Sequence, residues 1–153
     1  MYFELRLNPT VSIITAVRQS VTSIFDRVLA DPDATARIAL ATHELLENAR
    51  CHSTNGETLL NIRVDPPTHA VHIETRNQAT PDAIEKLQAK ATKIKTGDAD
   101  DAYLEAMQAA VLNNEIGGLG LVRIRAEGGM DIDIKAEGDT VRVLASTKYG
   151  AAA

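Results

Sequence analysis

The chain has 153 residues, of which 44% are hydrophobic and only 3% aromatic, and its formal net charge is −5. This length suits one domain with a substantial aliphatic core. The net negative charge, with acidic residues scattered along the chain, does not indicate a nucleic-acid-binding surface. The single cysteine, Cys51, rules out an intrachain disulfide and fits a reducing cytosol. No signal-like segment opens the chain and no apolar run reaches membrane-spanning length, so we expect a cytoplasmic protein without a membrane segment.

We expect one domain over residues 1–149 and a frayed tail over residues 150–153. The first third of the domain predicts one strand and two helices. Residues Tyr2–Leu7 alternate between apolar and polar, which predicts a strand at a sheet edge. Apolar residues then recur at helical spacing as far as Leu29. The segment Asp31–Asp33 ends this helix and caps a second one, which continues to about Ser53.

The middle of the chain predicts a hairpin followed by a helix. Two alternating segments, Leu60–Val64 and Val71–Thr75, flank the turn residues Asp65–Thr68. The second strand is expected to stop at the polar turn Arg76–Pro81. The helix after this turn has an inner face of four residues, Ile84, Leu87, Ala91 and Ile94.

The last third predicts two helices and a second hairpin. Three residues of the first helix are expected to face inward, namely Leu104, Met107 and Val111. A glycine-rich loop over Asn113–Leu121 runs into the second helix, Leu121–Glu127. Alternating residues then predict strands around Met130–Ile134 and Val141–Ala145. The element order β-α-α-β-β-α-α-α-β-β predicts an α+β two-layer sandwich with a mixed, largely antiparallel sheet and helices on one face.

The helix ending near Ser53 carries more polar side chains beside its apolar stripe than packing requires. At 100° per residue, five residues share one face, namely Ala34, Ile38, Ala41, Leu45 and Ala49. Glu44 and Asn48 lie one turn apart on the flank, at the border between core and solvent, and His52 continues the row. A carboxylate and a carboxamide placed in this way can converge on one bound group, such as a hydrated cation.

Three interpretations of this helix compete. The segment His43–Glu47 half-resembles the zinc-protease pattern H-E-x-x-H, but Glu47 replaces the second histidine and no third ligand is evident. In the second interpretation, Asn48 holds Mg²⁺ against nucleotide phosphates and Glu44 acts as a base or as a water-orienting group. In the third, the helix is simply amphipathic.

Two further segments favour the nucleotide interpretation. The loop Gly117–Gly120 precedes a helix, where glycines let backbone N–H groups approach an anion, although a tight turn explains it equally well alone. The strand end Thr75–Ala79 is polar and, alone, is typical of an ordinary turn.

Together these three segments resemble the histidine-kinase-like (GHKL) ATPases, and among them the anti-sigma-factor serine kinases of bacterial partner switching. Glu44–His52 matches the N-box E-x-x-x-N-A-x-x-H, and Gly118–Leu121 matches the glycine box G-L-G-L. Where these proteins carry D-x-G at the strand end, this chain has Asn77, Gln78 and Ala79. The order and spacing of the elements fit from Leu5 to Ala145.

The resemblance implies a Bergerat-type ATP-binding fold with a defined set of site residues. Asn48 would hold Mg²⁺, Asn77 would accept a hydrogen bond from adenine, and Glu44 would accept the substrate's hydroxyl proton. Four residues would surround the phosphates, namely Gly118, Leu119, Gly120 and Leu121. The segment Lys93–Asn114 would be the lid over the nucleotide. Asn77 lacks the charge of the usual aspartate and Ala79 adds a Cβ, so both departures weaken the expected adenine contact.

The function implied by the resemblance is transfer of the ATP γ-phosphate to a serine or threonine of a small partner. That partner would be a STAS-type antagonist, and the protein would sequester it or a sigma factor in turn. The alternative is a non-catalytic binding module of the same fold whose nucleotide binding is weakened or lost. A homodimer through the strand Tyr2–Leu7 is also implied by the resemblance. We expect no chemical role for His43, His69 and His72, and we expect Arg123 and Arg125 to lie on a solvated helix face.

Overall fold

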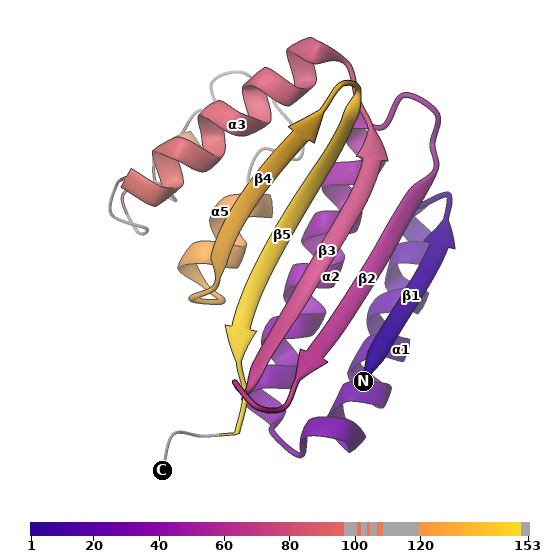
Figure 1. The fold of residues 1–153 in the computed structure, drawn as a ribbon, viewed down its shortest axis with the longest axis vertical. Helices are drawn as coiled ribbons and strands as arrows, with labels where there is room; N and C mark the ends of the chain where they lie inside the picture. Colours follow the sequence, from indigo (N-terminus) through magenta and orange to yellow (C-terminus); the bar gives the residue numbers. More distant parts are fainter. Residues whose placement is uncertain (97–100, 102–103, 105–106, 109–119, 151–153) are drawn as a thin grey trace.

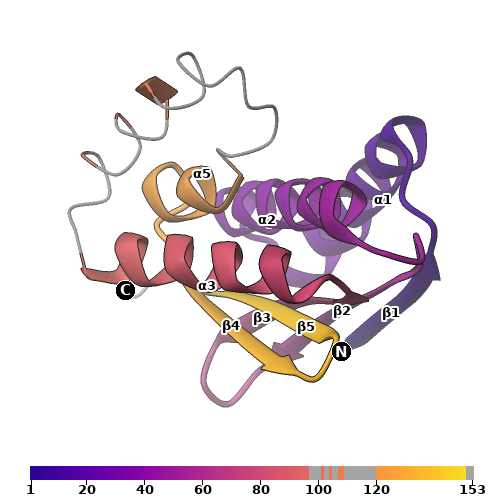
Figure 2. The ribbon, with the colours of Figure 1, turned by 90° about the horizontal axis from the view of Figure 1, so that it is seen from above.

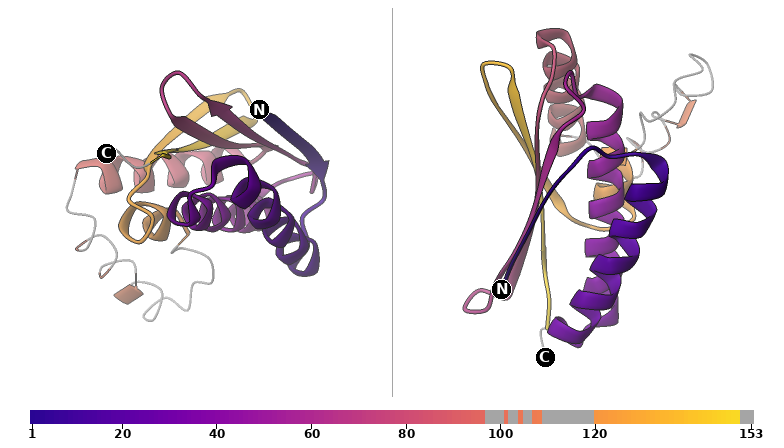
Figure 3. Two further views of the ribbon diagram at one scale, coloured as in Figure 1. Left: turned by 90° about the horizontal axis from the view of Figure 1, so that it is seen from below. Right: turned by 90° about the vertical axis from the view of Figure 1, so that its right-hand side faces the viewer.

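The computed structural model describes residues 1–96, 101, 104, 107–108 and 120–150. Its strands and helices are, in chain order, β1 (Tyr2–Leu7), α1 (Val11–Leu29), α2 (Pro32–His52), β2 (Thr58–Asp65), β3 (Ala70–Gln78), α3 (Pro81–Thr96), α5 (Gly120–Ala126), β4 (Asp131–Glu137) and β5 (Thr140–Lys148). The five described strands form one sheet in the order β1-β2-β3-β5-β4. Figures 2 and 3 show the four described helices on one face of this sheet.

The α+β two-layer architecture predicted from the sequence is therefore confirmed, including β1 at a sheet edge. All four strand pairings in the described part of the chain are antiparallel, so this sheet is purely antiparallel rather than mixed. In Figure 1, α2 runs behind the centre of the sheet, with α1 and α5 on its two sides. This central position makes α2 the main contributor to the core.

The sequence signals at the helix boundaries act as expected. Thr10 caps α1, because its side chain accepts a hydrogen bond from the Ile13 N–H at 3.3 Å. Asp31 caps α2 in the same way, accepting from the Ala34 N–H at 3.1 Å, and Pro32 occupies the first turn, where its missing N–H costs nothing. Between the two helices, Ala30 takes a left-handed conformation with φ 49°, which ends α1 and redirects the chain.

The core lies between α2 and the sheet. The five α2 residues predicted to share one face, Ala34, Ile38, Ala41, Leu45 and Ala49, are all buried. They meet the alternate residues of the central strands, which include Ile62, Ile73 and Val143. In α1, Val11 and Val28 also lie at helical spacing but are exposed near the two ends of the helix, whereas Ile14, Val17, Val21 and Phe25 are buried. Leu104 and Met107 are exposed rather than inward, since three apolar residues do not by themselves define a buried face. Val111 lies outside the described residues.

Both ends of α2 are fastened to the sheet. At its beginning, Asp31 accepts a hydrogen bond from the Gly150 N–H at 3.0 Å, and Arg37 donates to the Lys148 carbonyl at 2.8 Å. At its other end, the Thr54 N–H donates to the Gln78 carbonyl at 2.9 Å. The first contact holds the end of β5 and the second holds the end of β3. This fixes the position of α2 along the sheet.

Candidate functional site

Glu44 is buried where α2 meets α5. The Arg123 guanidinium of α5 lies 3.4 Å from the Glu44 Oε1 atom and forms an ion pair with it. The prediction that Glu44 lies at the border with solvent is therefore wrong, because α5 covers it. Arg123, expected on a solvated helix face, instead turns towards the candidate base. A buried carboxylate is costly without such a partner, and Arg123 supplies one here.

Gly120 begins α5 directly against Glu44. A Cβ atom at this position would lie 2.9 Å from the Glu44 Oε2 atom and 3.6 Å from the Glu44 backbone oxygen. The glycine therefore allows a close approach between the two helices that a side chain would prevent. Leu121, the next residue of the predicted glycine box, is buried in the core. Gly118 and Leu119 lie outside the described residues.

Asn48 and His52 continue the row from Glu44 towards the end of α2. Asn48 is half-buried, and its side chain makes no hydrogen bond to any residue in the described part of the chain. His52 is also half-buried, and this burial lowers the pKa of its imidazole, with Lys90 and Lys86 of α3 lowering the pKa further. The eight residue steps from Glu44 to His52 rise by about 12 Å along the helix. The row therefore runs from the start of α5 to the last turn of α2.

Asn77 lies near the end of β3 and is buried. The strand extends to Gln78, past the predicted stop at Arg76, because Asn77 and Gln78 pair in register with Val141 and Thr140 of β5. The Asn77 side-chain amide donates to the Gln78 carbonyl at 3.2 Å. The Ala79 N–H donates to the Asp139 carbonyl at 2.8 Å, and Ala79 has no positive φ, so a Cβ causes no backbone strain here.

The end of α2 and the end of β3 meet at one place in the fold. Beyond the backbone bond from Thr54 to Gln78, the Asn55 amide donates to the Gln78 side-chain oxygen at 3.3 Å. Asn77, next to Gln78, is thereby placed at the same end of the sandwich as His52. Helix α2 is thus contacted by Gly120 at Glu44, and the residues that follow α2 contact the end of β3.

Sequence reasoning missed three cations around this site. Arg123 pairs with Glu44, and Lys86 and Lys90 of α3 lie close enough to His52 to affect its pKa. Their positions follow from how α3 and α5 pack on α2, which helical periodicity does not specify.

The other histidines and the cysteine lie outside this row. His43 has a buried Nδ1 atom without a hydrogen-bond partner in the described chain. His72 shares a hydrogen bond with Ser146 at 2.9 Å, and Cys51 is exposed on the last turn of α2.

The donor set of the row suits a hard cation and its anionic partner. Asn48 offers an unengaged amide oxygen, a ligand type that Mg²⁺ accepts, and Glu44 adds a carboxylate one turn away. Within the described residues, no group of three or more His, Cys, Asp or Glu side chains is arranged to hold a metal by itself. A cation here would therefore need further oxygen ligands from a bound phosphate or from water.

In the described residues, no helix combines the length and hydropathy needed for crossing a bilayer.

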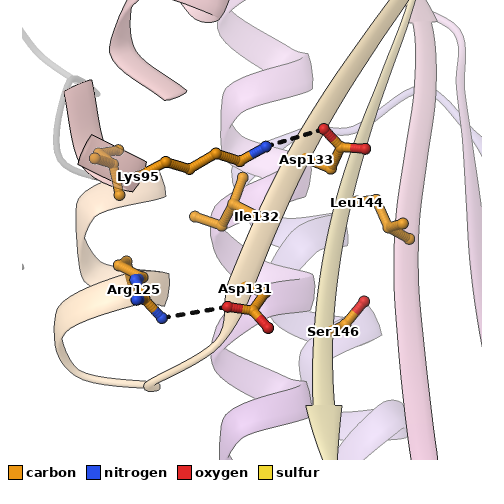
Figure 4. Close-up of a pocket in the computed structure, with 8 residues that line it drawn as sticks. Lys95, Arg125, Asp131, Ile132, Asp133, Leu144 and Ser146 are labelled. Carbon is orange, nitrogen blue, oxygen red and sulfur yellow. Dashed lines mark hydrogen bonds and ion pairs between the residues drawn. The ribbon is translucent and has the colours of Figure 1, made fainter. Parts of the chain in front are cut away.

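A separate cavity of about 320 Å³ lies beside the edge strand β4. Figure 4 shows two ion pairs across it, from Lys95 of α3 to Asp133 and from Arg125 of α5 to Asp131. The hydrogen bond from Lys95 lowers the pKa of Asp133. The cavity includes none of Glu44, Asn48 and Asn77, and its charges already satisfy one another. The two ion pairs connect α3 and α5 to the edge strand β4, and the cavity is distinct from the candidate site.

Comparisons with known proteins support the fold. No protein-family model matches the chain, and no curated protein matches it. Among solved structures, the chain is similar to one from the SiaB–SiaC complex of Pseudomonas aeruginosa, with 14% sequence identity and a TM-score of 0.71. The match covers 95% of this chain and 88% of the other. The likeness extends over nearly the whole fold, including the layers that position α2, β3 and α5.

Proposed function

We propose that this protein binds ATP with Mg²⁺ at the row formed by Glu44, Asn48 and His52 and that it regulates a partner protein. In this proposal, it transfers the γ-phosphate to a serine or threonine of a small STAS-type antagonist, and the transfer switches which partner it holds. The observation that carries the proposal is the Asn48 amide, which makes no hydrogen bond within the described residues and lies one helical turn from the buried Glu44 carboxylate. The SiaB–SiaC structure, which is itself a complex of two proteins, supports a partner-binding role.

The residues of the site divide the chemistry between them. Bound Mg²⁺ would neutralise phosphate charge, with Asn48 as its protein ligand. Glu44 accepts the proton of the partner's hydroxyl, whose oxygen forms a bond to the γ-phosphorus as the bond to the bridging oxygen of ADP breaks. Arg123 fixes the orientation of the Glu44 carboxylate from 3.4 Å away.

The other end of the row would receive the base of the nucleotide. Asn77 offers its side-chain oxygen to the adenine amino group, because its amide nitrogen already donates to Gln78. The phosphates lie near Gly118, Leu119, Gly120 and Leu121 in this proposal. Lys86 and Lys90 of α3 lie beside His52 at this end of the row, away from the proposed phosphate position.

A second candidate function is a non-catalytic partner-binding module. The observation that favours it is the Glu44–Arg123 ion pair. In this pair the carboxylate of the candidate base is already engaged by a cation of the same chain. The neutral Asn77 also forms a weaker bond to adenine than a carboxylate does. In this alternative, the two-layer platform binds its partner without phosphoryl transfer.

The two candidates are separated by calorimetric titration with ATP and ADP, each with and without Mg²⁺. The proposal predicts saturable binding that Mg²⁺ strengthens, with Asn48→Ala weakening the Mg²⁺-dependent part at least tenfold. Asn61→Ala is the matched control, because Asn61 lies on the opposite face of the sheet and bonds to Tyr2. Both variants should give the wild-type circular-dichroism spectrum.

No binding at millimolar nucleotide would overturn the proposal and leave the partner-binding module. Binding followed by transfer of labelled γ-phosphate to a co-purified protein, lost in Glu44→Gln, would establish the kinase reaction. Binding without transfer, unaffected by Glu44→Gln, would favour the second candidate.

A further inference from the structure

The face of the sheet opposite the helices is not covered by any described element. Figure 3 shows this face open along its whole length. The side chains that point to it alternate with the buried ones along each strand. In β3 and β5 they include Glu74, Arg76 and Arg142, whereas Ile73, Thr75 and Val143 point to the core. The open face therefore carries charged side chains that a partner can reach.

One row of residues across this face is strongly basic. The strand registers align Arg6 with Leu59, Leu59 with Arg76, Arg76 with Arg142, and Arg142 with Lys135. Four of these five aligned residues are cationic, and we call Arg6, Arg76, Arg142 and Lys135 the basic row. Four steps between neighbouring strands span about 19 Å. Like charges directly opposite each other destabilise a sheet, so the Arg76–Arg142 pairing has an energetic cost that folding alone does not require.

Glu74 relieves only part of this repulsion. Its carboxylate accepts two hydrogen bonds from Arg142, at 3.0 and 2.9 Å, and lies 3.6 Å from Arg76. One carboxylate therefore serves two guanidinium groups. Arg63, on the neighbouring strand, forms no ion pair with any residue in the described part of the chain.

A cavity of about 330 Å³ lies beside the basic row on the open face. Its lining includes three arginines, Arg63, Arg76 and Arg142, and one acidic residue, Glu74. With His72 neutral, three positive charges and one negative charge give the lining a net charge of +2, against −5 for the whole chain. Tyr2 and Asn61 complete the rim with a hydroxyl and an amide. This charge and these donors fit carboxylate groups that approach from outside.

We propose that the basic row and its cavity form a docking surface for an acidic segment of a protein partner. Carboxylates spaced along an extended peptide contact Arg63 and the basic row. The uncharged stretches between these carboxylates lie opposite Glu4 and Asp133, which belong to the neighbouring row of the sheet. The continuous charge of a nucleic-acid backbone would meet these same carboxylates unfavourably. This inference rests on the proposed function only in that the partner is a protein. It does not require the nucleotide site.

The test uses nucleotide-free full-length protein and a fluorescent octa-glutamate peptide, with octa-glutamine as the uncharged control. Fluorescence anisotropy should show saturable binding of octa-glutamate that weakens with added salt. Arg63→Gln and Arg76→Gln should each weaken binding about two- to fivefold, and the double variant should multiply the two effects. Arg63→Gln breaks no described ion pair, so its fold should remain intact.

Arg27→Gln is the matched control, since Arg27 is an exposed arginine of α1 in the helical layer. It should bind octa-glutamate like the wild type, and so should Asn48→Ala, because the nucleotide site is separate. Equal weakening by Arg27→Gln and Arg63→Gln would overturn the proposal, as would the absence of binding. Tighter binding of oligo-thymidylate or of anionic lipid vesicles than of the peptide would also overturn it.

Discussion

At the scale of single residues, the unusual feature is the charge on Glu44. Among the described residues, it is the only ionisable side chain that is buried. A buried charge is tolerated when a partner neutralises it, and Arg123 supplies that partner from 79 residues further along the chain. This pair adds to the apolar contacts by which α5 packs in the core.

Replacing Arg123 by methionine should lower the free energy of unfolding by about 1–2 kcal/mol, because it leaves a buried carboxylate without its cation. This figure is below that for a fully buried pair, since 42% of the Arg123 side chain is exposed. Urea unfolding of both single variants and of the Glu44→Gln/Arg123→Met double variant measures the coupling, which we expect to be about 1 kcal/mol.

Arg125→Met is the matched control, because Arg125 pairs with Asp131, whose side chain is 90% exposed. That substitution should change the free energy of unfolding by no more than about 0.5 kcal/mol. A coupling of zero between positions 44 and 123 would show that the observed proximity contributes nothing to stability.

At the scale of elements, sequence periodicity predicted what lies within each helix and strand. All five residues of the predicted α2 stripe are buried, although five further α2 residues are buried as well, and the cap at Asp31 is in place. Periodicity did not predict where β3 ends. Its last two residues, Asn77 and Gln78, belong to the strand because they pair with β5. It also did not predict how α5 lies on α2, where Gly120 approaches Glu44 closely.

Substituting Gly120 by alanine tests this close approach, because the resulting change in unfolding free energy should differ in sign between two backgrounds. In the wild-type background the new Cβ would displace the Glu44 carboxylate, and we expect a loss of about 1 kcal/mol in unfolding free energy. In a Glu44→Ala background the obstacle is gone, and the higher helix propensity of alanine should make the same substitution neutral or stabilising by up to about 1 kcal/mol.

Chemical unfolding of the four proteins in this cycle provides the measurement. The same loss in both backgrounds would mean that Gly120 is needed for its backbone conformation and not for its closeness to Glu44.

At the scale of the whole molecule, the candidate site depends on contacts between distant parts of the chain. The resemblance of two short motifs correctly predicted the two-layer architecture. The pairing of β3 with β5 and the positions of α3 and α5 on α2 are tertiary, and no local pattern encodes them. This is why Glu44 and Asn77 were identified from the sequence, whereas Arg123 and the basic row were not.

The hydrogen bonds that Asp31 accepts, at the beginning of α2, make the stability of the protein depend on pH. Hydrogen bonds from the Ala34 and Gly150 N–H groups lower the pKa of Asp31. This contribution is fully present above the unfolded-state pKa of about 3.9 and is lost as the pH falls through the lower folded-state pKa. Asp31→Asn should therefore lower the melting temperature at pH 7 and have a smaller effect at strongly acidic pH.

Thermal unfolding followed by circular dichroism between pH 7 and about pH 2.5 checks this expectation. Asp33→Asn, an exposed acid in the first turn of α2, is the comparison. Equal effects of both substitutions at every pH would show that the bond to Gly150 does not matter.

The exposed cysteine on the last turn of α2 has a practical consequence. Cys51 is the only cysteine of the sequence, and it directly precedes His52 in the row that leads to the candidate site. A thiol-reactive, environment-sensitive dye would therefore attach at one known position without any engineering of the chain. Under the proposed function, its emission would change when a nucleotide binds beside α2, while a partner bound at the proposed docking surface would leave it unchanged.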